Sequence, residues 1–420
     1  MRTHVNSIML SGALLLSFGC IAHAAEKVKP YPHYWMSVAT VNQSIPGMSE
    51  EMAGMAALFG KGPGFGPRRE LQLQLESPRQ APAKPEAAHE IPPGQQMGTA
   101  LTLVTPLQEK HEPVRPEHGD MPEKFEKPKG RMLLYWGCGD TIAKGQPRVF
   151  DAARMKPEEM AGFFKGRKVT RQTAPSAHSG WVYGEWPNRD ERKDIPRDSS
   201  LVGEQLVKGN YVPNINFSLG SKHDFMAPVE FTSLKSSPSG AMKVDWKAVP
   251  TAIGYFASAV GSDQKTGDMI FWSSSDVQEM GSSLMDYLTP GDISRFIREK
   301  VVMDPSRNSC TVPPVFKEVQ GAMLQFIAYG EQLDIVFPPK PKDPKQQWQP
   351  QWSVKVRLKS TGMTMLGESS AETGRPGKGK RSSRTQDEAG SDQSKQSDDD
   401  SDSGKSGGGV VDRMRGLFGF

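Results

Sequence analysis

The chain is long enough for two or three domains, but its composition is poor in core-forming residues. It has 420 residues, of which 36% are hydrophobic, together with 42 glycines and 34 prolines. This composition argues against one compact body and favours a β-rich, loop-rich protein with linkers. The 52 basic residues nearly balance the 48 acidic ones, and no segment concentrates positive charge, so we expect no nucleic-acid partner.

Residues 1–24 have the pattern of a cleavable signal peptide. A charged start precedes the apolar run 8–18, and Ala22-His23-Ala24 supplies the small residues that signal peptidase reads. The run is shorter than the roughly 20 residues that a membrane-spanning helix needs. We therefore expect export, cleavage after Ala24, and a periplasmic or secreted mature protein. The alternative is a lipoprotein with lipid on Cys20, although Ser17-Phe18 do not fit a lipoprotein signal.

Residues 25–97 are expected to form an extended arm and linker. Apolar residues from Ile45 to Phe59 recur on one helical face, which predicts a short Met-rich helix. We expect this face to pack on the protein itself, with a partner or an apolar ligand as the alternative. Alternation of leucine and glutamine at residues 71–75 predicts one strand, and residues 77–95 are typical of a linker.

Residues 98–225 are expected to form a first β-rich domain. Short apolar or alternating runs predict strands at 101–104, 132–136, 180–186 and 211–219, the second of them as a buried central strand. A short helix is predicted at 157–164. Several short strands between turns favour a sandwich. Three aromatic residues are candidates for glycan stacking, although core packing is their ordinary role: Trp181, Tyr183 and Trp186.

Residues 226–366 are expected to form a second β domain. An alternating run ends at Trp246, a turn follows at Val249-Pro250, and a second run begins at Gly254-Tyr255. Residues 229–276 resemble the early strands of fibronectin type III domains, in which a core Trp closes one strand and a Gly-Tyr opens the next. The resemblance implies a β-sandwich binding or spacer module with Trp246 and Tyr255 in its core, and it carries no reaction chemistry.

Beyond residue 276 the chain departs from that pattern. Thr289-Pro290 predicts the start of a helix, and further strands are predicted at 310–314, 322–329 and 352–358. The expected fold class is mainly β, with two β-sandwich-like domains, a few short helices, an extended N-terminal arm and a disordered C-terminal tail.

The tail has two parts of different composition. Residues 367–409 contain no large apolar side chain, so we expect a disordered tether. Residues 410–420 read VVDRMRGLFGF and form an amphipathic peptide that we expect to dock on the protein's own β domains, a partner protein or an anionic membrane surface. The expected partner-binding residues are Val410, Val411, Met414, Leu417, Phe418 and Phe420.

Signal cleavage leaves two cysteines, Cys138 and Cys310, in the mature chain. In an oxidising envelope compartment an even pair favours a disulfide, and two separately buried thiols are the alternative. We predict that the pair is bridged. Neither cysteine belongs to a CxxC motif, which argues against redox and zinc sites.

Known catalytic motifs are missing from the sequence. It has no HExxH and no GxSxG, and we expect no metal and no cofactor. We therefore expect an exported, non-catalytic cell-envelope scaffold that binds an envelope protein or a glycan. The alternative is an envelope hydrolase acting on glycan or peptide with an unfamiliar site near His178, Glu185 and Asp224.

Overall fold

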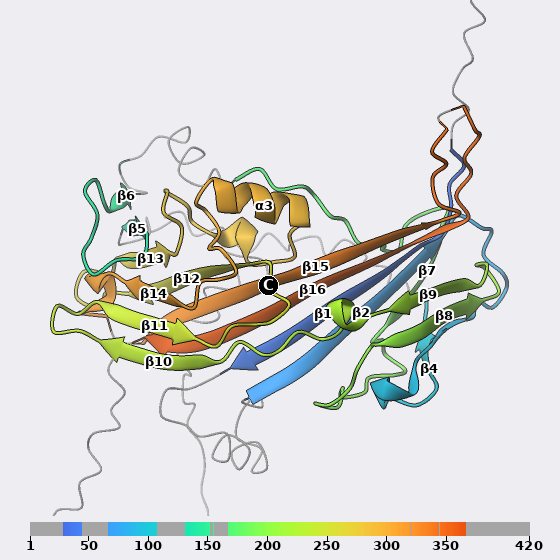
Figure 1. Ribbon diagram of the computed structural model, residues 1–420, viewed down its shortest axis with the longest axis horizontal. Coiled ribbons are helices and arrows are strands. Elements are labelled where there is room, and N and C mark those ends of the chain that lie inside the picture. The colour runs from blue at the N-terminus through green and yellow to red at the C-terminus, as the bar shows by residue number, and fades with distance from the viewer. Residues whose placement is uncertain are drawn as a thin grey trace, which may run out of the picture. The chain divides into compact units, whose positions relative to one another are not determined.

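The protein is mainly β, as the sequence predicts. The computed structural model describes residues 28–43, 66–106, 131–151, 154, 167–319, 321–343 and 345–366 (Figure 1). The chain divides into two units, Met1–Ala371 and Glu372–Phe420, and all described residues belong to the first. The predicted signal peptide, the helices at 45–59 and 157–164, the tether and the C-terminal peptide lie outside the described residues.

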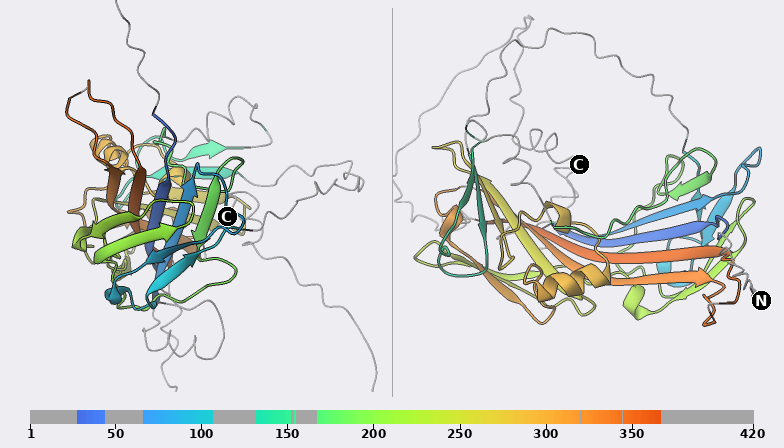
Figure 2. Two further views of the ribbon diagram at one scale, coloured as in Figure 1. Left: turned by 90° about the vertical axis from the view of Figure 1, so that its right-hand side faces the viewer. Right: turned by 90° about the horizontal axis from the view of Figure 1, so that it is seen from above.

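A nine-stranded sheet runs through the first unit. Its strands, in spatial order, are β6 (Arg148–Phe150), β5 (Met132–Trp136), β13 (Met269–Ser273), β12 (Gly254–Ser262), β15 (Ala322–Phe337), β16 (Trp352–Leu366), β1 (His33–Gln43), β2 (Gly66–Ser77) and β7 (Val182–Trp186). Two of the pairs, β1 with β16 and β5 with β13, are parallel, and the others are antiparallel. Figure 2 shows β1 and β2, in blue, beside the orange β15 and β16.

Two smaller sheets complete the fold. One contains β10 (Phe231–Ser236), β11 (Met242–Trp246) and β14 (Ser309–Val312), and the other contains β4 (Ala100–Leu103), β3 (Ala87–Glu90), β8 (Gly203–Gly209) and β9 (Ile215–Leu219). The described helices are α3 (Pro290–Arg298) and the 3₁₀ turns η1 (Pro93–Gln95), η2 (Ser221–His223), η3 (Ser282–Leu284) and η4 (Pro314–Phe316). Within the described residues no helix is both long and apolar enough to cross a bilayer.

The predicted division into an arm and two separate β domains differs from the observed pairing. Strand β1, from the predicted arm, lies between β16 and β2 and pairs with both over its whole length. Strand β5, from the predicted first domain, pairs with β13 of the predicted second domain. One sheet thus collects strands from all three segments, because backbone groups can pair across any sequence distance once apolar faces are buried together.

The region resembling fibronectin type III forms one half of this architecture. The β10-β11-β14 sheet packs on the part of the large sheet that contains β13, β12, β15 and β16, through a shared apolar cluster. Trp246 lies at its centre, 5.7 Å from the Tyr255 ring and 4.8 Å from the Phe326 ring between centroids. Both predicted core aromatics are buried, with Trp246 3% exposed and Tyr255 0%. This is the two-sheet packing that the resemblance implies.

The four-stranded sheet packs on the other end of the large sheet. Tyr34 of β1 contacts His89 of β3 and Phe217 of β9, and all three side chains are buried. Strand β2 places Leu71, Leu73 and Leu75 in the same core, as their alternation predicts. Strands β15 and β16, 16 and 15 residues long, therefore extend from one sandwich half toward the other as parts of a single sheet.

Helix α3 covers the opposite side of the large sheet from the β10-β11-β14 sheet. Thr289 caps it, since its hydroxyl oxygen accepts a hydrogen bond from the Asp292 amide, and Pro290 occupies the first turn. Ile293 and Phe296 are buried against Phe256 of β12, whose neighbour Tyr255 points to the other side. The helix predicted from Thr289-Pro290 is confirmed.

Strand β5 is one local prediction that the structure corrects. The run at 132–136 forms a strand, but it lies beside the short edge strand β6 and only Leu134 is buried. An apolar run of five residues is compatible with either a central or a near-edge strand, because the run does not reveal how many strands lie beyond it.

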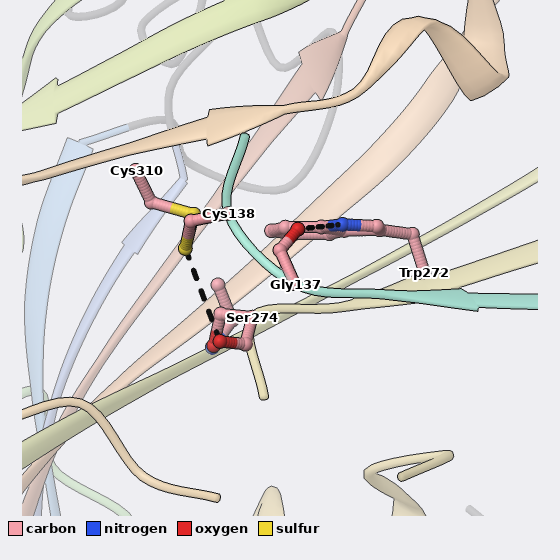
Figure 3. Close-up of a disulfide and its surroundings, with 6 residues drawn as sticks. Gly137, Cys138, Trp272, Ser274 and Cys310 are labelled. Atoms are coloured by element: carbon pink, nitrogen blue, oxygen red, sulfur yellow. Dashed lines mark hydrogen bonds between the residues drawn. A yellow bond between two sulfur atoms is a disulfide. The ribbon is translucent and has the colours of Figure 1, made fainter. Parts of the chain in front are cut away.

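The predicted disulfide is present in the structure. Cys138, just after β5, and Cys310 of β14 are bonded, with 5.2 Å between their Cα atoms and 172 residues between them in sequence (Figure 3). The bridge therefore links the large sheet to the β10-β11-β14 sheet. The Cys138 sulfur also lies 3.9 Å from the Ser274 carbonyl oxygen, a van der Waals contact because a bridged sulfur has no hydrogen to donate.

A buried histidine between the sheets makes stability depend on pH. The Tyr34 hydroxyl lies 2.8 Å from Nδ1 of His89, and Nε2 lies 2.9 Å from Oε1 of Gln205. Burial lowers the pKa of His89 from 6.5 to about 4, although the bond to Gln205 opposes this. Between these values the unfolded chain binds a proton that the folded protein does not. The free energy of unfolding therefore decreases as pH falls from 6.5 toward 4.

The His89→Gln variant tests this dependence. We expect its melting temperature to fall less steeply than that of the wild type between pH 6.5 and pH 4, whatever its absolute value at neutral pH. Thermal melts followed by circular dichroism at half-unit pH steps measure both slopes. Parallel slopes in the two proteins would show that His89 is not the titrating group.

Candidate functional site

Alternation along four neighbouring strands gives the large sheet one polar side. On β1, Tyr34 and Met36 are buried, whereas the alternating positions His33 and Trp35 are partly exposed. Strand β16 repeats this pattern, with Val354 and Val356 buried and the alternating residues Lys355 and Arg357 partly exposed. We call this side of β7, β2, β1 and β16 the polar face; most of its side chains are partly exposed, whereas Ser37 and Tyr183 are buried. Helix α3 lies on the same side of the sheet, because Tyr329 of β15 packs in the α3 cluster and pairs in register with Lys359 of β16.

Register aligns the polar face into cross-strand rows. The first row is Tyr183, Glu76, His33 and Ser353; the second is Glu185, Gln74, Trp35 and Lys355; the third is Gln72, Ser37 and Arg357. Side chains in one row, or diagonally adjacent between rows, are close enough to touch. The face thus carries acids at the β7–β2 side, amides in the middle, and cations on β16.

Basic side chains of β16 rest on two aromatic rings. Lys355 Nζ and the Arg357 guanidinium carbon each lie 5.2 Å from the Trp35 ring centroid. Arg357 and Lys359 each lie 4.3 Å from the Tyr287 ring, which belongs to the segment between η3 and α3. These are cation–π distances, and they hold the Arg357 side chain between two rings.

The three cations differ in how their charge is compensated. Lys355 forms an ion pair with Asp334 of β15, and Lys359 forms one of 2.8 Å with Asp286. Arg357 donates a 2.9 Å hydrogen bond from Nε to the Ser37 hydroxyl. Burial lowers the pKa of Arg357, yet a guanidinium keeps its proton at neutral pH.

An extended segment, residues 167–180, borders the polar face, and we call it the strap. At its start the Thr170 amide donates to Asp292 of α3 over 2.7 Å. Toward its end Gln74 of β2 donates to the Pro175 carbonyl over 3.2 Å, and His178 Nε2 lies 3.5 Å from the Glu76 carboxylate. The strap therefore runs from α3 to β2 on the polar side of the sheet.

The aromatic trio predicted for glycan stacking does not form a platform. Trp186 is 2% exposed and Tyr183 4% exposed, and strand alternation directs their side chains to opposite sides of β7. Trp181 is partly exposed and stacks on His33 at 6.0 Å with an interplanar angle of 12°. The prediction is wrong for Trp186 and Tyr183, because a buried ring offers no face to a sugar.

The residues of the predicted alternative hydrolase lie in two places. His178 contacts Glu76, and Glu185 accepts a 2.6 Å hydrogen bond from Tyr183, the residue paired with Glu76. Asp224 lies elsewhere, where it accepts a 2.6 Å bond from Ser200 and a 2.8 Å bond from the Leu201 amide. Two of the three predicted groups therefore share a neighbourhood with Glu76, and Asp224 stabilises a loop instead.

Sequence reasoning did not select the most distinctive residues of the polar face. Trp35, Arg357 and Tyr287 come together from segments far apart in the chain. A usable signal was present in β1, where Trp35 occupies a polar-phase position between buried Tyr34 and Met36. Tryptophan is enriched at binding interfaces, so a Trp on the polar side of a strand is a candidate for binding. Among the described residues no group of three or more His, Cys, Asp or Glu could hold a metal ion.

Comparisons with known proteins give no family assignment. No family model matches the chain, and no curated protein matches it. A solved structure, the Fcho1 Mu homology domain from Danio rerio with a bound Eps15 peptide, is 8% identical and covers 82% of this chain and 99% of its own, with a TM-score of 0.23. A likeness this weak carries no argument about either fold or function.

Proposed function

We propose that the protein is an exported, non-catalytic scaffold of the cell envelope that binds a protein or glycan partner. The observation that carries the proposal is the polar face, where partly exposed Trp35 lies near the Arg357 cation and the exposed Gln72 amide on a continuous sheet. Rigid sheets hold such side chains in fixed positions, which lowers the entropic cost of binding. No covalent chemistry is needed for this role.

The disulfide supports the proposed location. Bridges such as that between Cys138 and Cys310 persist in oxidising compartments and are rare in reducing ones. The signal-like residues 1–24 support export, and the proposed location of the mature protein is the periplasm or the extracellular space. Lipid attachment at Cys20 is the less favoured form of the same proposal. Sequencing of the mature N-terminus distinguishes the two, since signal-peptidase cleavage leaves Ala25 and lipoprotein processing leaves modified Cys20.

Capture of envelope components by the immobilised mature protein tests the binding role. We expect Trp35→Ala to reduce capture, because it removes the ring at the centre of the polar face. Lys235→Ala, at an exposed position on β10, is the control and should leave capture unchanged. Equal capture by all three proteins would exclude the polar face as the binding surface.

The C-terminal peptide gives a separate expected result. We propose that residues 410–420 dock on a partner or on the envelope through their apolar face, with peripheral membrane contact as one form of docking. Deletion of residues 410–420 should weaken envelope association in fractionation and leave the melting temperature unchanged. If the truncated protein fractionates and co-purifies like the intact one, the docking role is wrong.

A second function is favoured by one observation. Glu76 and Glu185 are diagonal neighbours on β2 and β7, which places two carboxylates on one side of the sheet, and glycoside hydrolases use such a pair. An envelope hydrolase acting on glycan would use this pair, with His178 beside Glu76. Release of reducing ends from cell-wall glycan by the wild type, lost in Glu185→Gln, would establish it, and no release from any glycan tested would reject it.

A further inference from the structure

Arg357 stands apart from the neighbouring cations of β16. Lys355 and Lys359 form ion pairs with Asp334 and Asp286, whereas no described residue places a carboxylate within ion-pair distance of Arg357, which Asp286 attracts only from farther away. Its Nε donates to Ser37, and in the described part of the chain its terminal nitrogens have no hydrogen-bond partner. A guanidinium has five N–H donors, so most of its capacity is available to a ligand.

The surroundings of Arg357 make it a stronger anion site than an ordinary surface arginine. It is partly buried, with the Trp35 ring 5.2 Å away and the Tyr287 ring 4.3 Å away. The rings restrict the side chain before any ligand arrives, so less rotamer entropy is lost on binding. Partial removal from water also strengthens the attraction to an incoming anion. The planar fork matches a carboxylate, which it can bind through two parallel hydrogen bonds.

Acids elsewhere on the face limit what the rest of the ligand can be. From Arg357 the adjacent strands present Ser37 and Gln72, Glu70 lies one row away on β2, and Glu185 lies on β7, three strand spacings or about 14 Å away. A second carboxylate placed near Glu185 and Glu76 would be repelled. The exposed Gln72 amide and the Trp35 ring instead suit neutral, hydroxyl-rich rings, because amides hydrogen-bond hydroxyl groups and aromatic faces stack on sugars.

We propose that the polar face binds an acidic glycan in which neutral sugars separate the carboxylates, with Arg357 holding one ring carboxylate. A neighbouring sugar lies against Trp35 and over the exposed amide of Gln72. The inference rests on the proposed function, whose partner it narrows to this class of glycan. A polyacidic peptide fits less well, because its closely spaced carboxylates would meet Glu76 and Glu185.

Calorimetry with hyaluronan oligosaccharides, in which uronic acid alternates with a neutral sugar, tests the proposal. The comparison ligand is the same oligosaccharide with its carboxyl groups reduced to alcohols. We expect the wild type to bind hyaluronan roughly tenfold or more tightly than the reduced form, since a charged hydrogen-bonded contact is lost. Rising salt should weaken only the binding of the charged ligand.

Matched variants assign the effect to Arg357. Arg357→Met keeps an apolar stem between the rings. This variant should bind hyaluronan about as weakly as the wild type binds the reduced oligosaccharide. It should bind the reduced oligosaccharide with the same affinity as the wild type does. Arg357→Lys should recover part of the loss. Lys235→Met, which removes an exposed cation on β10, should bind like the wild type. Melting temperatures of all variants show whether each is folded.

Three outcomes would overturn the inference. These are equal wild-type affinity for both oligosaccharides, no measurable binding of hyaluronan at millimolar concentration, or an equal loss for both ligands in Arg357→Met, which would make Arg357 a structural residue. Tighter binding of poly-glutamate than of hyaluronan would point to a peptide partner instead. If hyaluronan fails while Trp35→Ala still abolishes capture of envelope components, the scaffold function stands and only the glycan assignment falls.

Discussion

Replacement of Trp246 by alanine is expected to lower the free energy of unfolding by about 3–5 kcal/mol. The ring is 3% exposed and lies between Tyr255 and Phe326, so its removal leaves a cavity that the surrounding strands cannot fill without moving. The loss includes the edge-to-face contact between Trp246 and Tyr255, whose ring planes form an angle of 70°. Chemical denaturation monitored by circular dichroism measures the change.

The matched control for Trp246→Ala is a substitution on an exposed strand position. Met365 of β16 is 45% exposed, so Met365→Ala should change the free energy of unfolding by no more than about 0.5 kcal/mol. A melting temperature of Trp246→Ala equal to that of the wild type would contradict the core role that both the fibronectin-like pattern and the structure give to this residue.

Loss of the Cys138–Cys310 bridge is expected to cost about 2–4 kcal/mol. The bridge closes a loop of 172 residues and joins the large sheet to the β10-β11-β14 sheet. Breaking it enlarges the set of unfolded conformations, and the long loop makes that gain large. The double variant Cys138→Ser/Cys310→Ser should therefore melt at a lower temperature than the oxidised wild type.

Reductant supplies the control for the bridge. Adding it should lower the melting temperature of the wild type and leave the double serine variant unchanged, because the remaining cysteine of the sequence, Cys20, lies in the predicted signal peptide. Peptide mapping without reduction should recover the two cysteines in one cross-linked pair. Recovery of both as free thiols, or equal melting with and without reductant, would reject the prediction.

Local features of the fold were accessible from sequence because they depend on near neighbours. The alternation of Leu71, Leu73 and Leu75 needs only the two-residue period of a strand, and the cap at Thr289 needs only the first turn of its helix. Trp246 and Tyr255 were identified as core residues from a pattern confined to residues 229–276. Each of these predictions concerns a short stretch whose geometry fixes where its side chains point.

The site residues show where such reasoning stops. Burial of Trp186 and Tyr183 depends on the strands and the strap around β7, so their aromatic character alone did not reveal whether their rings are accessible. The contact of Trp35 with Arg357 joins residues more than three hundred positions apart, through the parallel pairing of β1 with β16. A period-two pattern tells that a strand has a polar side, but not which strand lies beside it.

By itself, the sequence determined the β class, most strand positions, the capped helix, the cysteine pair and the signal-like start. Only the tertiary structure decided that the predicted arm supplies central strands, that one sheet spans both sandwich halves, and that Arg357 lies between Trp35 and Tyr287. The physical reason is that strand pairing uses backbone groups common to every residue. The choice of neighbour is made by the burial of all apolar faces at once, which no single segment encodes.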